Sequence, residues 1–223
     1  MKAFFVTGTD TGVGKTLVAC AMLHTLRQRH ARVVGMKPVA AGAVQTSDGL
    51  ASEDALALRA FSSVAVPPEL DNPVLLPEPL SPHLAAQRAG KRIAIDHIVR
   101  CQRELARLTD AMVVEGAGGF HVPLSPTETG ADLAQALGLP LVLVVGLRLG
   151  CLNHALLTAE AIRARGLTLA GWVANRIDPA MPAHQENIAF LRERLQAPLL
   201  ADVAHSTAPD PRQIAITLPE DPA

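Results

Sequence analysis

The sequence is poor in aromatic residues and carries almost no net charge. Phenylalanine, tryptophan and tyrosine make up 3% of its 223 residues, tyrosine is absent and tryptophan occurs once. Proteins that bind single-stranded nucleic acids depend on such side chains for base stacking. The 20 Lys and Arg residues against 21 Asp and Glu give a formal net charge of −1, so the chain lacks the positive excess that binds a phosphate backbone. We therefore expect no nucleic-acid partner.

Cysteines are few and the hydrophobic runs are short. The three cysteines, Cys20, Cys101 and Cys151, are far apart and lack metal-ligand spacing, which predicts neither a disulfide framework nor a zinc site. The apolar stretch before the first glycine is too short for a signal peptide. The longest central apolar run, 139–145, is far below the ~20 residues that span a bilayer. We expect a cytoplasmic protein without a membrane partner.

Segment 8–16, with the sequence GTDTGVGKT, is the most informative part of the chain. It follows the short apolar run 4–6 and opens an apolar helix, which is the context of a phosphate-binding loop rather than of a chance glycine-rich turn. Backbone N–H groups at such a helix start point at phosphates. Lys15 can reach the β- and γ-phosphates and the Thr16 hydroxyl can bind Mg²⁺. Five residues separate Gly8 from Gly14, one more than in the common pattern.

Apolar strand patterns alternate with helical patterns along the whole chain. This alternation predicts an α/β fold of the P-loop NTPase kind, a parallel sheet with helices on both faces. No domain boundary is visible, so we expect one domain over 1–223. We expect irregular structure in 38–52 and in the proline-rich segment 64–82. The expected strands are 3–6, 32–36, 111–115, 140–145, 168–174 and 199–203, and the expected helices are 16–29, 53–61, 95–108, 130–137, 152–165 and 182–195.

Ligands of such folds bind at the carboxyl ends of the strands, so the residues there are candidates. Glu115 closes an apolar strand before Gly-Ala-Gly-Gly, which favours contact with a phosphate-bound cation over a surface role. Lys37 follows the second strand and could neutralise phosphate charge, although a solvent-facing lysine fits its position equally well. Spacing does not choose a second carboxylate ligand among Asp48, Glu53 and Asp54.

Two further strand ends carry candidates with plain alternatives. Segment 150–153 opens a helix and could bind a carboxylate, or form an ordinary turn. Asn175 has the donor and acceptor that suit an adenine edge, or it forms a turn. No Ser/His/Asp or Cys/His nucleophile set stands out.

Several blocks in order, together with the phosphate loop, resemble the dethiobiotin synthetase family, the ATP-dependent carboxylases of biotin biosynthesis. The tail beyond about residue 203 matches weakly. The resemblance implies a P-loop α/β fold, a homodimer, and the substrates 7,8-diaminononanoate, CO₂ and ATP with Mg²⁺. The matching blocks are 5–16, 35–42, 54–58, 77–86, 113–125, 140–162 and 169–177.

The resemblance also implies roles for residues at matching positions, and it selects Asp54 over the other two carboxylates. Lys15, Lys37 and Thr11 would be catalytic, and Thr16, Asp54 and Glu115 would hold Mg²⁺. The nucleotide would contact Gly12, Val13, Gly14, Lys15, Thr16, Leu17, Glu115, Gly118 and Asn175. The diamine would contact Thr11, Lys37, Ala41, Pro79, Ser81 and Gly118, and its carboxylate would contact Leu149, Gly150, Cys151 and Asn153 of the partner subunit.

Four positions depart from the better-known members of the family. Ala41 stands where many have Ser, Gly12 where bacterial enzymes have Glu, Asn187 where they have Tyr, and Ala204 where a proline is expected. We expect these differences to affect substrate affinity and nucleotide selectivity, and to leave the reaction class unchanged.

Two other protein classes share the same scaffold. An amidoligase of the cobyrinate synthetase kind needs a glutaminase partner, and the chain has neither room for that domain nor an obvious Cys/His dyad. A partition or cell-division switch ATPase carries an additional lysine early in the loop, where this chain has Asp10. The chain also lacks the basic patch or amphipathic membrane helix such switches use.

Overall fold

A six-stranded parallel sheet forms the centre of the protein. The computed structural model describes residues 1–47 and 49–219. Every pairing within the sheet is parallel, which confirms the predicted fold class. In the order β10-β9-β8-β1-β7-β2, the strands are Leu199–Val203, Leu169–Asn175, Leu141–Gly146, Lys2–Gly8, Ala111–Glu115 and Val33–Met36.

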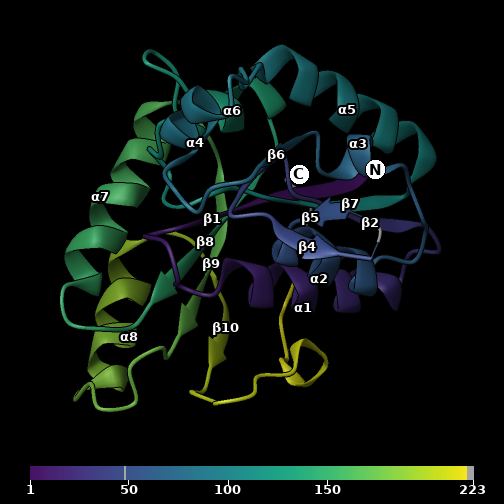
Figure 1. The fold of residues 1–223 in the computed structure, drawn as a ribbon. Coiled ribbons are helices and arrows are strands. Elements are labelled where there is room, and N and C mark those ends of the chain that lie inside the picture. The colour runs from purple at the N-terminus through teal and green to yellow at the C-terminus, as the bar shows by residue number, and fades with distance from the viewer. Residues whose placement is uncertain (48, 220–223) are drawn as a thin grey trace.

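Helices cover both faces of this sheet (Figure 1). Phe4 and Val6 of β1 pack toward α1 and α2, whereas Ala3 and Phe5 pack in the opposite cluster with α5 and α6. A third cluster joins α7 and α8 to β8 and β9. Because both faces are buried, the strands are apolar without alternation. The helices that cover the sheet include α1 (Lys15–Arg27), α2 (Glu53–Phe61), α5 (Ile95–Leu108), α6 (Gly130–Leu137), α7 (Cys151–Ala164) and α8 (His184–Arg194).

The expectation of irregular structure in 38–52 and 64–82 was wrong in part. The two segments pair with each other, because β3 (Val39–Ala41) lies parallel to β6 (Val74–Leu76). β4 (Val44–Thr46) and β5 (Gly49–Ala51) form an antiparallel hairpin. Strands of three residues are too short to show a period, and the β3–β6 pairing joins distant parts of the chain. Prolines begin two short helices here, as suits a first helical turn: α3 (Pro68–Asp71) and α4 (Pro82–Arg88).

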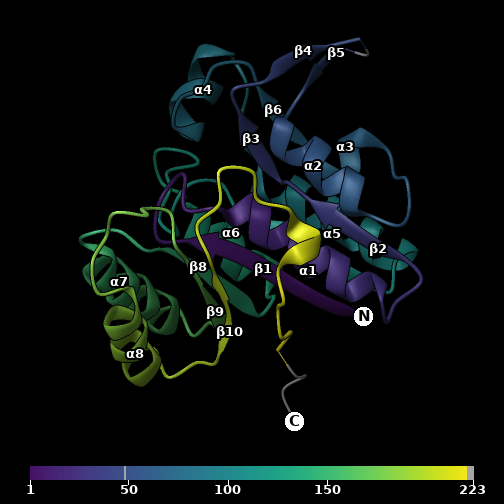
Figure 2. The ribbon, with the colours of Figure 1, turned by 90° about the horizontal axis from the view of Figure 1, so that it is seen from below.

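The tail after β10 packs on the α1 face of the sheet (Figure 2). It contains a short 3₁₀ turn, η1 (Pro211–Gln213), and the buried side chain of Ile216. The Thr217 N–H donates to Leu200 O at 2.9 Å. These contacts support our proposal that the chain forms one domain over 1–223. Within residues 1–47 and 49–219, no helix combines the length and apolar character that crossing a bilayer requires.

Asp132 in the first turn of α6 makes a contact with a measurable pH dependence. Its Oδ2 accepts from the Thr129 N–H at 2.7 Å, and its Oδ1 lies 2.6 Å from Arg165 Nη1. The hydrogen bond from Arg165 is the main cause that lowers the pKa of Asp132 from 3.8 to about 2, against the effect of desolvation. Because the folded-state pKa is depressed, this stabilisation is present above the unfolded pKa and is lost as the pH falls toward 2.

We expect Asp132→Asn to lower the free energy of unfolding at pH 7 by about 1 kcal/mol, the usual size of a helix-cap contact. The difference from wild type should shrink between about pH 4 and pH 2, since the wild type loses the same contact there. Urea unfolding followed by circular dichroism at several pH values measures both effects. Asp96→Asn, an exposed first-turn carboxylate of α5, is the control. If Asp132→Asn lowered the free energy of unfolding by the same amount at pH 7 and at pH 2, this explanation would be contradicted.

Candidate active site

The loop between β1 and α1 has the backbone that an anion site requires. Gly12 and Gly14 adopt left-handed φ values of 75° and 91°. A Cβ at Gly14 would lie 2.2 Å from Asn175 Nδ2, so only glycine fits there. Gly14 caps α1 without a side-chain hydrogen bond, and the first turn of α1 holds no acidic residue. The positive end of the α1 dipole is therefore not neutralised by a local carboxylate.

The strand register brings Glu115 and Lys37 to one edge of the sheet. In the β1–β7 pair Val6 lies opposite Glu115, and in the β2–β7 pair Met36 lies opposite Val114. Glu115 and Lys37 therefore end adjacent strands at the same level, next to the loop that follows β1. Their meeting follows from parallel pairing, because the carboxyl ends of all these strands share one edge.

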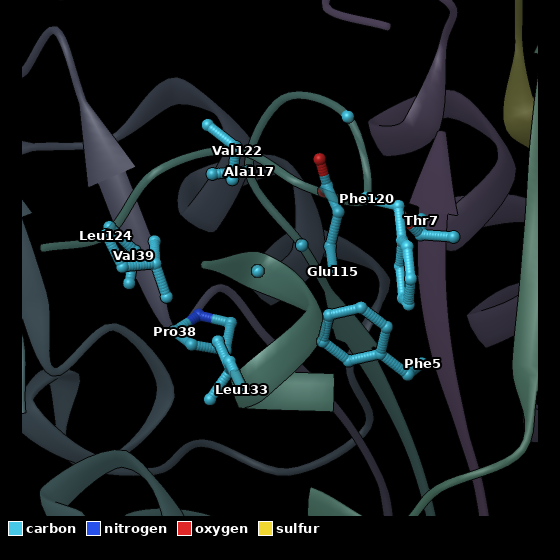
Figure 3. Close-up of a pocket in the computed structure, with 13 residues that line it drawn as sticks. Phe5, Thr7, Pro38, Val39, Glu115, Ala117, Phe120, Val122, Leu124 and Leu133 are labelled. Carbon is cyan, nitrogen blue, oxygen red and sulfur yellow. The ribbon is translucent and has the colours of Figure 1, made fainter. Parts of the chain in front are cut away.

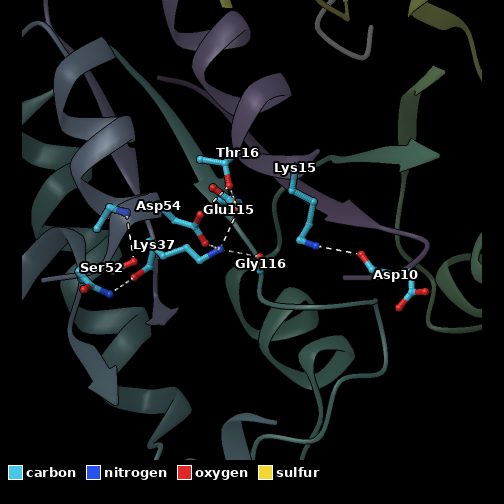
Figure 4. Close-up of polar contacts among 10 residues, drawn as sticks. Asp10, Lys15, Thr16, Lys37, Ser52, Asp54, Glu115 and Gly116 are labelled. Carbon is cyan, nitrogen blue, oxygen red and sulfur yellow. Dashed lines mark hydrogen bonds and ion pairs between the residues drawn. The ribbon is translucent and has the colours of Figure 1, made fainter. Parts of the chain in front are cut away.

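A cluster of polar side chains lies at this edge (Figure 4). Thr16 Oγ1 is 2.9 Å from Asp54 Oδ1 and 2.9 Å from Glu115 Oε1. Lys37 Nζ is 2.7 Å from Asp54 Oδ2 and 2.7 Å from Glu115 Oε1. The start of α2 delivers Asp54, since the Ser52 side chain caps that helix by accepting from the Ala55 N–H at 3.3 Å.

The structure thus separates two of the three candidate carboxylates left open by spacing. Asp54 reaches Thr16 and Lys37, whereas the neighbouring Glu53 is exposed. Asp48 lies outside the described residues. Glu53 and Asp54 are successive residues of a helix and therefore point in different directions, so only Asp54 faces the cluster.

Two carboxylates keep the buried lysine of this cluster protonated. The side chains of Lys37 and Glu115 are only 4% and 1% exposed. Burial acts to lower the pKa of Lys37, but the carboxylates of Glu115 and Asp54 outweigh it and the pKa is raised. Burial acts to raise the pKa of Asp54, and the Lys37 ammonium outweighs it, so that pKa is lowered. Lys37 is therefore a fixed positive charge between two carboxylates.

Lys15 is held by the loop backbone instead of by a carboxylate. Its Nζ donates to Asp10 O at 3.0 Å, while the Asp10 side chain pairs with Arg148 in the loop after β8. Burial, followed by repulsion from Lys37, lowers the pKa of Lys15 to about 8. A phosphate anion at the loop would supply the negative charge that this buried amine lacks.

The residues of this cluster fit a magnesium ion. Glu115 Oε2 is buried without a hydrogen-bond partner within the described chain, and a cation is the partner that such an oxygen takes. Within the part of the chain that the structure describes, no group of three or more His, Cys, Asp or Glu side chains could form a complete protein cage. Mg²⁺ is typically held by one or two carboxylates together with phosphate oxygens and water, which is the donor set available here.

An apolar pocket packs the stem of Glu115 from behind (Figure 3). Phe5, Phe120 and Leu133 line it, and Glu115 extends away from Phe5 and Leu133. The free space of about 10 Å³ is close to the minimum that holds one water molecule. This packing explains why the Glu115 side chain is almost fully buried and fixes the direction of its carboxylate.

A cleft of about 710 Å³ opens from the phosphate loop toward β3 and the segment before α4. Twelve residues predicted for the site line it together. Six more were missed by the sequence analysis, namely Val39, Ala40, Leu80, Pro82, Ala117 and Val122. They adjoin predicted residues in sequence, but small and apolar side chains carry no chemical pattern of their own. The twelve are Thr11, Gly12, Gly14, Lys15, Thr16, Lys37, Ala41, Asp54, Pro79, Ser81, Glu115 and Gly118.

Three residues predicted for nucleotide binding lie outside the lining of this cleft. Val13 is buried beneath the loop, and Leu17 packs against the α1-side core. Asn175 is 6% exposed, and its Nδ2 donates to Val13 O at 2.8 Å. Asn175 thus braces the loop from below.

The four residues predicted to act across a subunit boundary also lie outside this cleft, at the start of α7. Leu149 is 94% exposed, and Gly150 and Asn153 are exposed beside it. The Cys151 side chain is buried in the core that α7 and α8 share. A single exposed leucine is common on protein surfaces and does not by itself mark an interface.

Comparison with known proteins agrees with this geometry. The sequence profile of a family described as an AAA domain matches residues 2–211. The ATP-dependent dethiobiotin synthetase BioD of Aromatoleum aromaticum is 52% identical over 219 residues, covering 97% of this chain and 96% of that protein.

Among solved structures, a ParA family ATPase from Chlorobium tepidum is similar with a TM-score of 0.58 and 17% identity, covering 92% of this chain and 85% of that one. The signal recognition particle receptor FtsY from Elizabethkingia anophelis, in complex with GDP, is similar with a TM-score of 0.56 and 15% identity, covering 97% and 60%. These two likenesses concern the fold alone. The extent and identity of the sequence match show that the chain belongs to the ATP-dependent dethiobiotin synthetase family.

Proposed function

We propose that this protein joins CO₂ to 7,8-diaminononanoate and closes the ring to dethiobiotin, with conversion of ATP to ADP and phosphate. The observation that carries the proposal is the single cleft in which a phosphate loop, the Thr16–Asp54–Glu115 cluster and the wall from Ala41 to Ser81 lie together. The 52% identical relative bears the name of this activity. The same family supports ATP as co-substrate and biotin biosynthesis as the process.

The chemistry proceeds in three steps. One amine of the diamine adds to CO₂ and loses a proton, which gives a carbamate. A carbamate oxygen attacks the γ-phosphorus of ATP, the bond to the bridging oxygen breaks, and ADP leaves. The second amine then attacks the carbamate carbon, and phosphate leaves as the cyclic urea forms. No step needs a protein nucleophile, so the enzyme acts by orientation and by stabilising charge.

Two lysines would stabilise the transferring phosphoryl group. Lys15 lies at the loop, where its amine can meet the phosphates, and Lys37 brings a second positive charge from the opposite side of Thr16. A charge that is fixed before the reaction costs no reorganisation when the phosphoryl group leaves ADP. Thr11 and Gly118, on facing loops, would contact the reacting amine and carbamate.

Thr16, Asp54 and Glu115 would hold Mg²⁺. When bound, Mg²⁺ supplies charge neutralisation at the phosphate oxygens. The protein's own part is to aim both carboxylates at one place, which the pairing with Lys37 and the packing around Glu115 support.

The apolar wall of the cleft suits the carbon chain of the diamine. Val39 and Ala41 come from β3, and Pro79 comes from the segment that follows β6, the strand paired with β3. Ser81 places a hydroxyl on the same wall. Ala41 offers only a methyl group, so a substrate amine there would depend on other donors.

We further propose that the working unit is a cytoplasmic homodimer with a shared site. In each site, Leu149, Gly150, Cys151 and Asn153 of the second subunit would approach the substrate carboxylate. These residues lie outside the cleft of their own subunit, so they would meet the substrate only in the cleft of the second subunit.

A mixed dimer tests the shared site directly. One subunit carries Lys15→Ala and the other carries Asn153→Asp, and a heterodimer is purified through two different tags. One of its sites combines both defects and the other combines neither, so it should keep about half of the wild-type activity. Each homodimer alone should be almost inactive. A heterodimer as inactive as the two homodimers would contradict the shared site.

The reaction itself is tested with isotopically labelled bicarbonate. Purified protein, ATP, magnesium and the diamine should give a product with the mass of dethiobiotin that carries the label. Product without label, or no product while ATP is consumed, would contradict the proposed function.

A further inference from the structure

The main chain of Lys37 is held on both sides by one corner of the structure at the end of α3. The Lys37 N–H donates to Asp71 O at 2.7 Å, and Asn72 Nδ2 donates to Lys37 O at 2.7 Å. The next residue continues this attachment, since the Val74 N–H donates to Pro38 O at 3.1 Å. The segment that follows β2 is thus fixed where Lys37 leaves the sheet.

Both side chains of this corner are polar and buried. Asp71 is 2% exposed and Asn72 is 8% exposed. A buried amide or carboxylate is costly unless it is paired. The side-chain amide of Asn72 donates to Lys37 O. The main-chain N–H of Asn72 caps α3 by donating to Pro68 O at 2.9 Å.

An ion pair links the same corner to α2. Arg59 donates to Asp71 in a bidentate arrangement, with Nε 2.7 Å from Oδ2 and Nη2 2.6 Å from Oδ1. Arg59 lies in the helix whose first turn carries Asp54. The corner therefore holds the backbone of Lys37 on one side and the helix of its partner Asp54 on the other.

We propose that Arg59, Asp71 and Asn72 are positioning residues that set the Lys37 ammonium relative to Asp54 and Glu115. None of the three lines the active-site cleft. They act through Lys37 and α2. The proposal deepens the proposed function and depends on it for its effect on turnover.

Small displacements matter at this place. Lys37 meets two carboxylates at 2.7 Å each, so a shift of its backbone cannot preserve both contacts. A misplacement of about 1 Å in a catalytic group can lower the rate by about 10²-fold. The phosphate loop is attached to other elements, so nucleotide binding should change little.

The test uses Asn72→Leu, which keeps the approximate size and removes the donor. We expect kcat to fall by about 10-fold to 100-fold while the KM for ATP stays within about twofold. In a Lys37→Met background the same change should lower the residual kcat no further, because its effect passes through Lys37. Arg59→Lys is the second variant, which keeps the charge and removes the bidentate contact, with a smaller fall in kcat.

Ser63→Ala is the matched control. The Ser63 hydroxyl accepts from the Val33 N–H at 2.8 Å, so this substitution removes a similar hydrogen bond at the other end of β2. It should lower stability without changing kcat. An equal fall in kcat for Asn72→Leu in both backgrounds, or for Ser63→Ala, would overturn the proposal.

A measurement without turnover separates this proposal from the proposed function. The chain has only four lysines, Lys2, Lys15, Lys37 and Lys91, so labelled ammonium groups can be resolved by NMR. In Asn72→Leu and Arg59→Lys the Lys37 ammonium resonance should shift or broaden while that of Lys15 stays. Unchanged Lys37 resonances in both folded variants would overturn the positioning role, even in an active enzyme. A wild-type protein that makes no dethiobiotin would instead contradict the proposed function alone.

Discussion

Lys15→Ala is expected to lower kcat for dethiobiotin formation by about 10³-fold or more, the range found when a charge that stabilises a phosphoryl-transfer transition state is removed. The Lys15 amine is one of two lysines at this edge of the sheet, and it is held by Asp10 O within the loop. Its loss leaves the developing charge on the phosphate oxygens without its nearest fixed cation. Steady-state phosphate release with saturating diamine measures the effect.

The fold should survive this change. The Lys15 side chain donates a hydrogen bond to a loop carbonyl, and no carboxylate within residues 1–47 and 49–219 forms an ion pair with it. Thermal unfolding and circular dichroism should therefore stay close to wild type. Lys91→Ala, a surface lysine that contacts Leu75 O, is the matched control and should keep full activity. A Lys15→Ala enzyme with more than about a tenth of wild-type kcat would contradict the assigned role.

Glu115→Gln is expected to lower kcat by about 10²-fold to 10³-fold and to raise the magnesium concentration needed for half-maximal activity. Glutamine keeps the size of the side chain and its packing against Phe5 and Leu133. It removes the charge that attracts the metal and one of the two charges that pair with Lys37. Titration of activity with magnesium, at saturating ATP and diamine, separates the two effects.

A second variant controls for the loss of a carboxylate as such. Glu104→Gln removes an exposed carboxylate from α5, and it should change neither kcat nor the magnesium concentration needed for half-maximal activity. Asp54 still pairs with Lys37 in Glu115→Gln, so no buried charge is left alone. A variant with a normal magnesium requirement and a low kcat would refute the metal role and leave only an effect through Lys37.

The long elements of this fold could be predicted from the sequence. The helices 53–61, 95–108 and 130–137 and the strand 111–115 were predicted with the observed bounds, since their hydrophobic patterns are sustained and their ends carry clear caps or turns. The three-residue strands β3 to β6 could not be predicted. Their pairing depends on where distant segments meet, and no local pattern reports that.

The tail after residue 203 shows the same limit. The tail is rich in proline and polar residues, yet Ile216 is buried against the core beside α1. Ile214 and Leu218 pack against the same cluster, and this alternation of three residues is too short to predict burial from the sequence alone.

The candidate site was predictable where chemistry follows strand ends. Lys15 and Thr16 belong to a recognisable loop, and Glu115 and Lys37 follow buried strands. Asp54 could not be chosen over Glu53 by spacing, because both belong to the first turn of α2. Asn72 was not predicted at all, since a side-chain bond to the main chain of Lys37 leaves no pattern in sequence.

The scaffold that this protein shares with the ParA and FtsY structures does not carry its function. Identity of 17% and 15% accompanies TM-scores of 0.58 and 0.56, which describe a common arrangement of strands and helices. The wall formed by β3, β6 and the segment before α4 lies beside the phosphate loop, and we expect substrate choice to reside there.

The most direct measurement is phosphate release from ATP, with magnesium and bicarbonate, in the presence and absence of 7,8-diaminononanoate, with dethiobiotin quantified in the same samples. The account predicts release that depends on the diamine and matches the dethiobiotin formed mole for mole. ATP hydrolysis at the same rate without the diamine, and no dethiobiotin in either sample, would contradict it.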